Sequence, residues 1–135
     1  MRRAALWVVL LGSVVVVLGV LWQAFSIAAY VRGAGESALD AHLTGSFFVH
    51  AGQLMVVFGA ICAWWGKWDQ VALALGFLIL SFAQLAFLGD TDEQGGWING
   101  LHGFLALIIL LAGVWYFSRA RRELGIGPPR TAASD

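Results

Sequence analysis

Three histidines set within apolar sequence are the residues of this 135-residue chain with the clearest capacity for chemistry. His50 lies inside one long apolar run, His102 lies at the start of another, and His42 precedes His50 by eight residues. A neutral imidazole is a ligand of haem iron and of other transition metals. A polar side chain in a membrane span costs free energy unless it faces the protein interior and finds a partner, so such residues mark candidate sites.

Amide and hydroxyl side chains occur in all four apolar runs, and two of these runs also contain a histidine. At 100° per residue, the polar residues of the second run fall within an arc of about 80° on one helix face. Polar residues of the other runs are three apart and therefore also share a face. The candidate cofactor-binding set is Gln23, His42, Ser46, His50, Gln53, Gln84, Asn99 and His102.

The depths of the histidines favour a haem site. His50 and His102 each lie sixteen residues from the inner end of their run, at Gly66 and Ser118, or about 24 Å along a helix. His42 comes about 12 Å further out. We therefore expect one haem b with His50 and His102 as axial ligands, with His42 as the alternative ligand.

The surroundings of the haem follow from the same placement. Amides and hydroxyls would hold the second nitrogen of each imidazole. Gly52 and Gly103 would leave room for a flat ring, and phenylalanines such as Phe47, Phe48, Phe82, Phe87 and Phe104 would line it. The inner half of the bundle is expected to be almost wholly apolar.

Two iron ligands from protein favour electron transfer or haem handling over enzymatic chemistry, because the iron keeps no open position. Zinc or copper would need three or four close ligands, and His42 is placed too far out to join the other two. No serine stands beside a histidine with an orienting carboxylate, so nucleophilic catalysis lacks support. The alternative is a non-redox accessory membrane subunit whose polar pocket is structural or binds a lipid or quinone head group.

Composition places the chain in a membrane. Hydrophobic residues make up 60% and charged residues 12%, far from the roughly 45–50% and 25% of soluble domains. The formal net charge is zero, so nucleic-acid binding is not expected. Cys62 is the single cysteine, which excludes a disulfide within the chain.

Four apolar runs predict an all-α, up-down-up-down four-helix membrane bundle over residues 1–123, followed by a flexible tail at 124–135. The runs cover about 6–29, 46–65, 71–88 and 97–117, each close to the roughly 20 residues of a membrane-spanning helix. Gly45, Gly52 and Gly59 recur every seven residues and predict a stripe on which a neighbouring helix packs closely.

The basic residues predict the orientation in the cell membrane. Seven of them fall on one side of the spans and only Arg32 on the other; the seven are Arg2, Arg3, Lys67, Arg119, Arg121, Arg122 and Arg130. Lys and Arg stay on the cytoplasmic side. We expect a multi-pass protein with both termini cytoplasmic and the haem near the outer leaflet. The expected partners are the lipid bilayer, a membrane quinone or an outer-face redox protein, and a larger membrane complex.

Two segments resemble known haem proteins. Asp40-Ala41-His42 and the segment Asn99-Gly100-Leu101-His102-Gly103-Phe104-Leu105-Ala106-Leu107 look like one four-helix half of haem A synthase. Residues 5–120 also resemble a family of small, uncharacterised four-helix bacterial membrane proteins with a histidine pair and a glutamine in the first and third spans. The resemblance implies haem between histidines of the second and fourth helices. Leu39 and Leu43 stand where the synthase pattern has an acid and an arginine, so it implies the haem-holding scaffold only, and it leaves His42 or His50 as the partner of His102.

Overall fold

The computed structural model describes residues 1–87 and 93–127, which are almost entirely helical. Its elements are α1 (Arg2–Ala29), a short π-helical segment η1 (Tyr30–Ala34), α2 (Glu36–Ala63), α3 (Trp68–Ala83), a 3₁₀ turn η2 (Gln84–Phe87) and α4 (Glu93–Glu123). Four helices are long and apolar enough to cross a membrane. The predicted all-α class and the four membrane-length helices are confirmed. Of the predicted tail, residues 128–135 lie outside the described residues.

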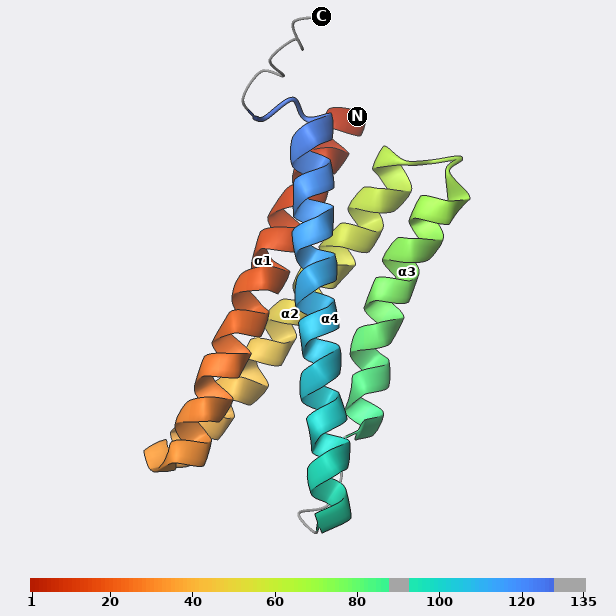
Figure 1. The fold of residues 1–135 in the computed structure, drawn as a ribbon. Coiled ribbons are helices and arrows are strands. Elements are labelled where there is room, and N and C mark those ends of the chain that lie inside the picture. Colours follow the sequence, from red (N-terminus) through yellow and green to blue (C-terminus); the bar gives the residue numbers. More distant parts are fainter. Residues whose placement is uncertain (88–92, 128–135) are drawn as a thin grey trace, which may run out of the picture.

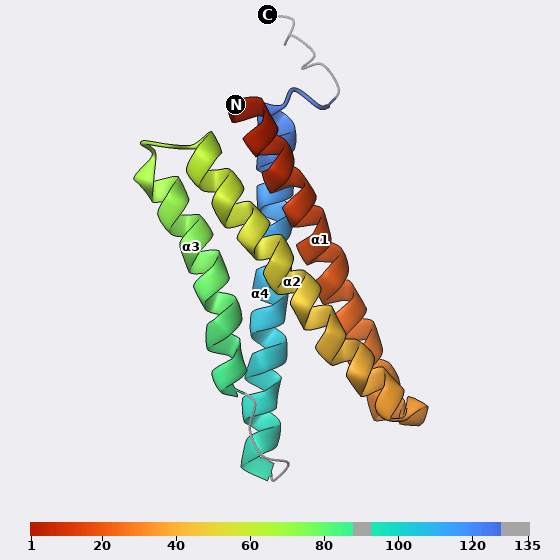
Figure 2. The same cartoon turned by 180° about the vertical axis from the view of Figure 1, so that it is seen from behind.

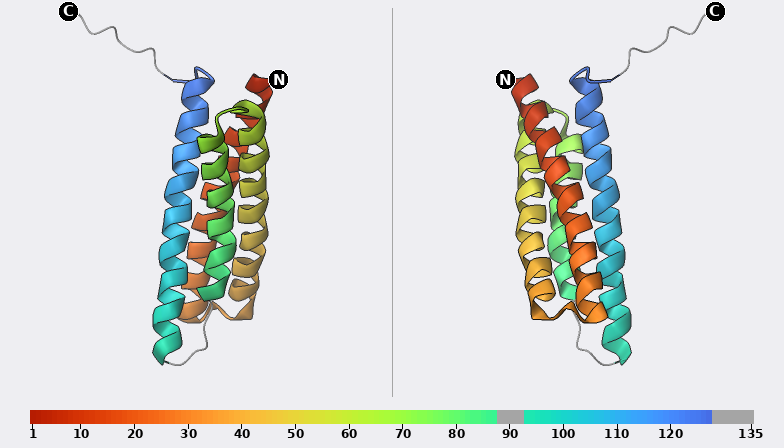
Figure 3. Two further views of the ribbon diagram at one scale, coloured as in Figure 1. Left: turned by 90° about the vertical axis from the view of Figure 1, so that its right-hand side faces the viewer. Right: turned by 90° about the vertical axis from the view of Figure 1, so that its left-hand side faces the viewer.

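The helices lie side by side and run alternately up and down (Figures 1 and 3). The N-terminus, the α2–α3 connection and the end of α4 lie together, and we call this the inner end; η1, η2 and the start of α4 mark the outer end (Figure 1). The α1–α2 pair diverges from the α3–α4 pair toward the outer end, as seen from both sides (Figures 1 and 2).

The helices extend beyond the apolar runs that predicted them. α2 begins at Glu36 rather than near residue 46, and α4 continues to Glu123 rather than ending at 117. Gly33 and Gly35 turn the chain before α2 with φ values of 92° and 82°, which only glycine adopts at little cost. Glu36 then places a negative charge at the helix N-terminus, where the helix dipole favours it. Hydropathy marks the hydrocarbon crossing, whereas the backbone hydrogen bonds continue past it.

Glycines bring α1 and α2 into close contact. A Cβ built on Gly52 would lie 2.7 Å from the carbonyl oxygen of Gly12, and one on Gly59 would lie 2.7 Å from Cγ2 of Val9. The predicted glycine stripe is therefore confirmed as a helix-packing surface, with α1 as its partner. The expectation that Gly52 leaves room for a flat ring is wrong, because α1 fills that space.

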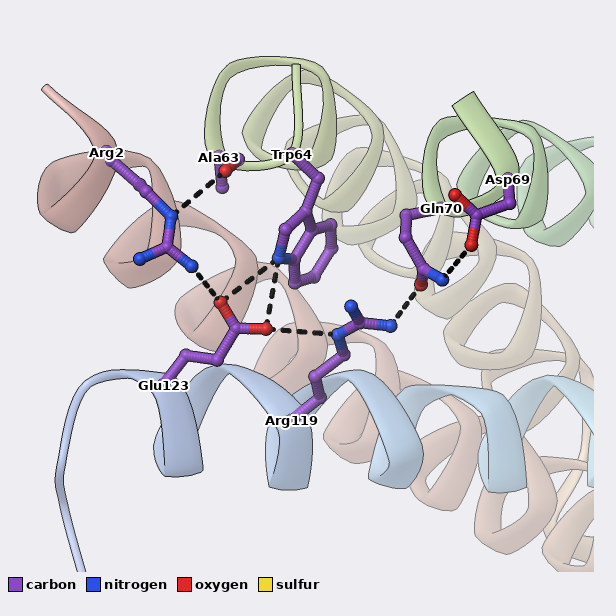
Figure 4. A network of polar contacts seen from close by, with 7 residues as sticks. All are labelled: Arg2, Ala63, Trp64, Asp69, Gln70, Arg119 and Glu123. Atoms are coloured by element: carbon purple, nitrogen blue, oxygen red, sulfur yellow. Dashed lines mark hydrogen bonds and ion pairs between the residues drawn. The ribbon is translucent and has the colours of Figure 1, made fainter. Parts of the chain in front are cut away.

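The inner end is closed by a polar network that joins all four helices (Figure 4). Glu123 of α4 lies at its centre: its carboxylate accepts hydrogen bonds from Nε1 of Trp64 at 3.1 and 3.2 Å and from Nε of Arg119 at 3.2 Å, and it pairs with Arg2 of α1. Arg119 also donates to the side chain of Gln70 on α3. Its guanidinium carbon stands 4.4 Å from the ring centroid of Trp64, within cation–π range.

We expect Glu123→Gln to lower the free energy of unfolding by about 1–2 kcal/mol, because two ion pairs lose their anion at a partly exposed site. The measurement is unfolding of the purified protein in mixed detergent micelles. Arg122→Gln is the matched control, since Arg122 is an exposed charge beside Glu123, and its effect should stay within about 0.5 kcal/mol. Equal effects of the two substitutions would show that the network does not hold the helices together.

Candidate functional site

His50 presents a buried nitrogen that has no partner among the described residues. Its Nδ1 lies 2.8 Å from the carbonyl oxygen of Ser46, one turn earlier on α2. A carbonyl only accepts, so Nδ1 carries the proton and Nε2 keeps its lone pair. That Nε2 is buried and makes no hydrogen bond there. The ring of Phe82 on α3 packs on the imidazole with centroids 4.9 Å apart.

His102 of α4 also bonds a backbone carbonyl through Nδ1, but here the carbonyl comes from another segment of the chain. Its Nδ1 lies 3.1 Å from the carbonyl oxygen of Gln84, which begins η2. Its Nε2 is therefore also the nitrogen with the free electron pair. His50 contacts Phe82 near the end of α3, and His102 contacts Gln84 at the start of η2, two residues further along the chain.

His42 is tied to α1. Its Nδ1 lies 2.9 Å from the carbonyl oxygen of Gln23, and Nε2 of Gln23 donates to the carbonyl oxygen of His42 at 3.4 Å. This pair of bonds links α1 to the outer half of α2. Since the α1–α2 pair diverges from α3 and α4 toward the outer end (Figure 1), His42 belongs to a different helix contact from His50 and His102.

Three side-chain oxygens of α2, α3 and η2 are also buried without partners among the described residues. Gln53 is fully buried, and its Nε2 donates to the carbonyl oxygen of Phe77 on α3 at 2.9 Å, while its Oε1 has no partner. Oγ of Ser81 and Oε1 of Gln84 are also buried and have no hydrogen-bond partner among the described residues. Buried polar atoms are normally hydrogen-bonded, and each exception costs about 1–3 kcal/mol.

We call His50, Gln53, Ser81, Gln84 and His102 the α2–α3–α4 polar cluster. Ser81 was missing from the predicted set, although its helical spacing from Gln84 places both on one face of α3. A ligand or water that supplies donors would satisfy the open acceptors of the cluster.

Ser46 joins this cluster through its backbone only. The hydroxyl of Ser46 donates to the carbonyl oxygen of Leu43 in its own helix at 2.6 Å. Ser46 therefore contacts His50 only through its backbone carbonyl, which accepts the hydrogen bond of Nδ1. Asn99 is exposed on α4, one turn from His102.

Most of the predicted aromatic lining faces outward. Phe47, Phe48 and Phe104 are 76%, 59% and 58% exposed, so they belong to the surface of the chain rather than to an interior cavity. The inner half is also less apolar than expected, because the Glu123 network and the buried Tyr116 lie there.

Two of the grooves on the described surface are wide and open, and neither of these two is lined by a histidine. One lies between α1 and α2 in the outer half, with a volume of about 680 Å³, and the other lies between α3 and α4, with about 730 Å³. Among residues 1–87 and 93–127, no three His, Cys, Asp or Glu side chains gather closely enough to hold a metal ion. The candidate donors are therefore two imidazoles, one on α2 and one on α4, and the buried amide and hydroxyl side chains.

No protein family model, curated protein or solved structure matches the chain. Its function is therefore inferred from the residues and their geometry.

Proposed function

We propose that this protein is a b-type cytochrome of the cell membrane, which holds one haem b between His50 and His102 for electron transfer or haem handling. The observation that carries the proposal is the buried Nε2 of His50, which has no partner among the described residues while Nδ1 is fixed on the carbonyl of Ser46. For His102, Nδ1 is likewise fixed, on the carbonyl of Gln84. Metal-bound histidines characteristically donate their second nitrogen to such an acceptor.

The donor set fits haem better than it fits a small metal ion. Haem iron needs only two axial ligands from protein, and the porphyrin supplies the other four. His50 and His102 come from different helices that both contact the outer end of α3. When bound, haem would supply one-electron chemistry. The residues of the chain would hold it, orient it and keep water away.

A non-redox accessory subunit is the second candidate, and one feature favours it. The Gln53 amide bonds to the carbonyl of Phe77, and His102 bonds to the carbonyl of Gln84, so polar side chains already join α3 to both neighbours. Such bonds stabilise membrane bundles without any cofactor. The open acceptors would then take up water or a lipid or quinone head group.

Haem stoichiometry separates the two candidates. The full chain is purified from membranes of cells supplied with a haem precursor, and its haem is measured as the pyridine haemochromogen. The cytochrome proposal expects one haem b per chain. Protein that is folded, helical and free of haem would support the accessory subunit instead.

The proposed orientation places both termini in the cytoplasm, because six of the seven basic residues that the structure describes lie at the inner end. In a Cys62→Ala background, a cysteine at Glu36 should react with an impermeant maleimide in intact cells. A cysteine at Lys67 should react only after the membrane is opened. Both residues are exposed, at opposite ends of α2. The reverse labelling pattern would contradict the orientation.

His42→Ala should leave haem bound, because His42 is bonded to Gln23 of α1 rather than to α3 or α4. We expect a haem content equal to that of the parent and a loss of about 1 kcal/mol of unfolding free energy for the hydrogen bond removed. Haem content and helicity are measured on the same sample. A folded but haem-free His42→Ala protein would make His42 the ligand opposite His102.

A further inference from the structure

The inner end carries more basic side chains than its carboxylates pair with. Six basic residues and two carboxylates of the described chain lie there. One of the carboxylates, Glu123, is occupied by Arg2 and Arg119. Exposed basic side chains that make no ion pair or hydrogen bond with any described residue remain on α1, on the α2–α3 connection and on α4; they are Arg3, Lys67 and Arg122, which we call the inner-end cations. This end therefore keeps unpaired positive charge.

On α1 and α4, an exposed tryptophan lies deeper along the helix than the inner-end cation. Trp7 follows Arg3 by four residues of α1, and it is exposed. Trp115 precedes Arg122 by seven residues of α4, and it is also exposed. At 100° per residue, both spacings place the two members of a pair within about 40° of each other on one helix face. Each cation thus stands above an indole on the surface of its helix.

The α2–α3 connection combines the same residue types. Lys67 lies between Trp65 and Trp68, which are both exposed and whose ring centroids are 5.3 Å apart. Gly66 has a φ of 83° and turns the chain at this point. Tryptophan is enriched at the headgroup level of membranes, and Lys and Arg extend their charge outward from there. All three inner-end cations therefore have tryptophan at the depth where lipid headgroups begin.

We propose that the inner end binds anionic phospholipids, with the inner-end cations contacting the headgroup phosphates and the exposed tryptophans lying against the glycerol region. Unpaired positive charge attracts a lipid with net negative charge, whereas the choline of a zwitterionic lipid cancels its phosphate. The tryptophans favour an anion that is held in a membrane over one that is free in water. Bound lipid also offsets the repulsion among the six basic residues of this end.

The test compares brominated phosphatidylglycerol with brominated phosphatidylcholine as quenchers of tryptophan fluorescence, with the full chain in lipid nanodiscs. Quenching at matched mole fractions gives the association constant of one lipid relative to the other. We expect the parent to prefer phosphatidylglycerol at least about fivefold, the factor that one basic residue near a headgroup supplies. About 1 M salt should reduce this preference, because it shortens the Debye length to about 3 Å.

Substitutions show whether the inner-end cations produce the preference. The triple variant Arg3→Gln/Lys67→Gln/Arg122→Gln should keep its helicity and bind both lipids equally. Lys67→Gln alone, which changes no helix interior, should lower the preference partway. Arg32→Gln is the matched control, since Arg32 is an exposed basic residue at the outer end, and it should behave like the parent. A parent without preference, or a preference that these cations do not change, would overturn the proposal.

A free anion would give a different result. If inorganic phosphate raises the unfolding temperature of the detergent-purified parent as much as dioctanoyl phosphatidylglycerol does, the site binds soluble anions and the lipid proposal is wrong. Lipid binding does not depend on haem. The His50→Ala/His102→Ala double variant should keep the preference for phosphatidylglycerol, so failure of the haem proposal and failure of this one are distinguishable.

Discussion

His50→Ala and His102→Ala should each abolish haem retention, or leave a haem whose iron binds added imidazole. Each substitution would remove one of the two proposed haem ligands, and each proposed ligand is bonded to one backbone carbonyl, that of Ser46 or Gln84. The measurement is the haem content of purified protein, with the visible spectrum recorded before and after addition of imidazole. We expect haem content to fall at least about tenfold, because losing an axial bond worth more than 1.4 kcal/mol changes occupancy by that factor.

The matched control is His42→Ala, which removes an imidazole from the same helix without touching α3 or α4. Helicity of all three variants is checked, so that loss of haem is not confused with loss of fold. Full haem content in folded His50→Ala protein would exclude His50 as a ligand.

Gly52→Ala should destabilise the bundle by about 1–3 kcal/mol, the usual cost of overpacking. The added Cβ would lie 2.7 Å from the carbonyl oxygen of Gly12 and 2.9 Å from Cγ2 of Val16. The first of these is backbone, so the clash is relieved only if α1 and α2 move apart. The free energy of unfolding in mixed micelles measures the loss.

Gly76→Ala provides the comparison for Gly52→Ala. Both glycines lie within helices, but the Cβ of an alanine at Gly76 would meet no atom within 4 Å. We expect Gly76→Ala to be neutral or to gain up to about 1 kcal/mol from helix propensity. If Gly52→Ala and Gly76→Ala lower the free energy of unfolding equally, the close α1–α2 contact does not explain the loss in Gly52→Ala.

Periodicity and hydropathy predicted the helices and one of their contacts well. Four apolar runs of membrane length became α1, α2, α3 and α4, since lipid leaves the backbone no partner but itself. The seven-residue spacing of Gly45, Gly52 and Gly59 identified the packing face of α2. The ends of the helices escaped prediction, because hydropathy stops at the hydrocarbon boundary while α2 and α4 continue past it.

Side-chain partners were predictable only where spacing along one helix decides them. Counting residues along each helix predicted level depths for His50 and His102, and in the structure they contact Phe82 of α3 and Gln84 of η2. The bond of His42 to Gln23 depends on how α1 and α2 pair, which no single helix encodes. The basic members of the Glu123 network predicted only the orientation in the membrane. The network itself was not predicted, because its members come from all four helices.

Ser81 and Tyr116 illustrate a different limit. Both are common residues of membrane helices. What distinguishes them is a buried hydroxyl that has no partner among the described residues. That condition depends on the packing of α3 with its neighbours. The sequence offered only the shared face of Ser81 and Gln84 as a clue.

The most direct test of the cytochrome is the visible spectrum of the parent protein purified from haem-replete membranes. Two imidazole ligands make the iron six-coordinate and low-spin, and they exclude other ligands. We expect a sharp b-type spectrum on reduction that carbon monoxide barely changes. Folded protein without visible absorption, in which His50→Ala and His102→Ala are both as stable as the parent, would contradict the haem proposal.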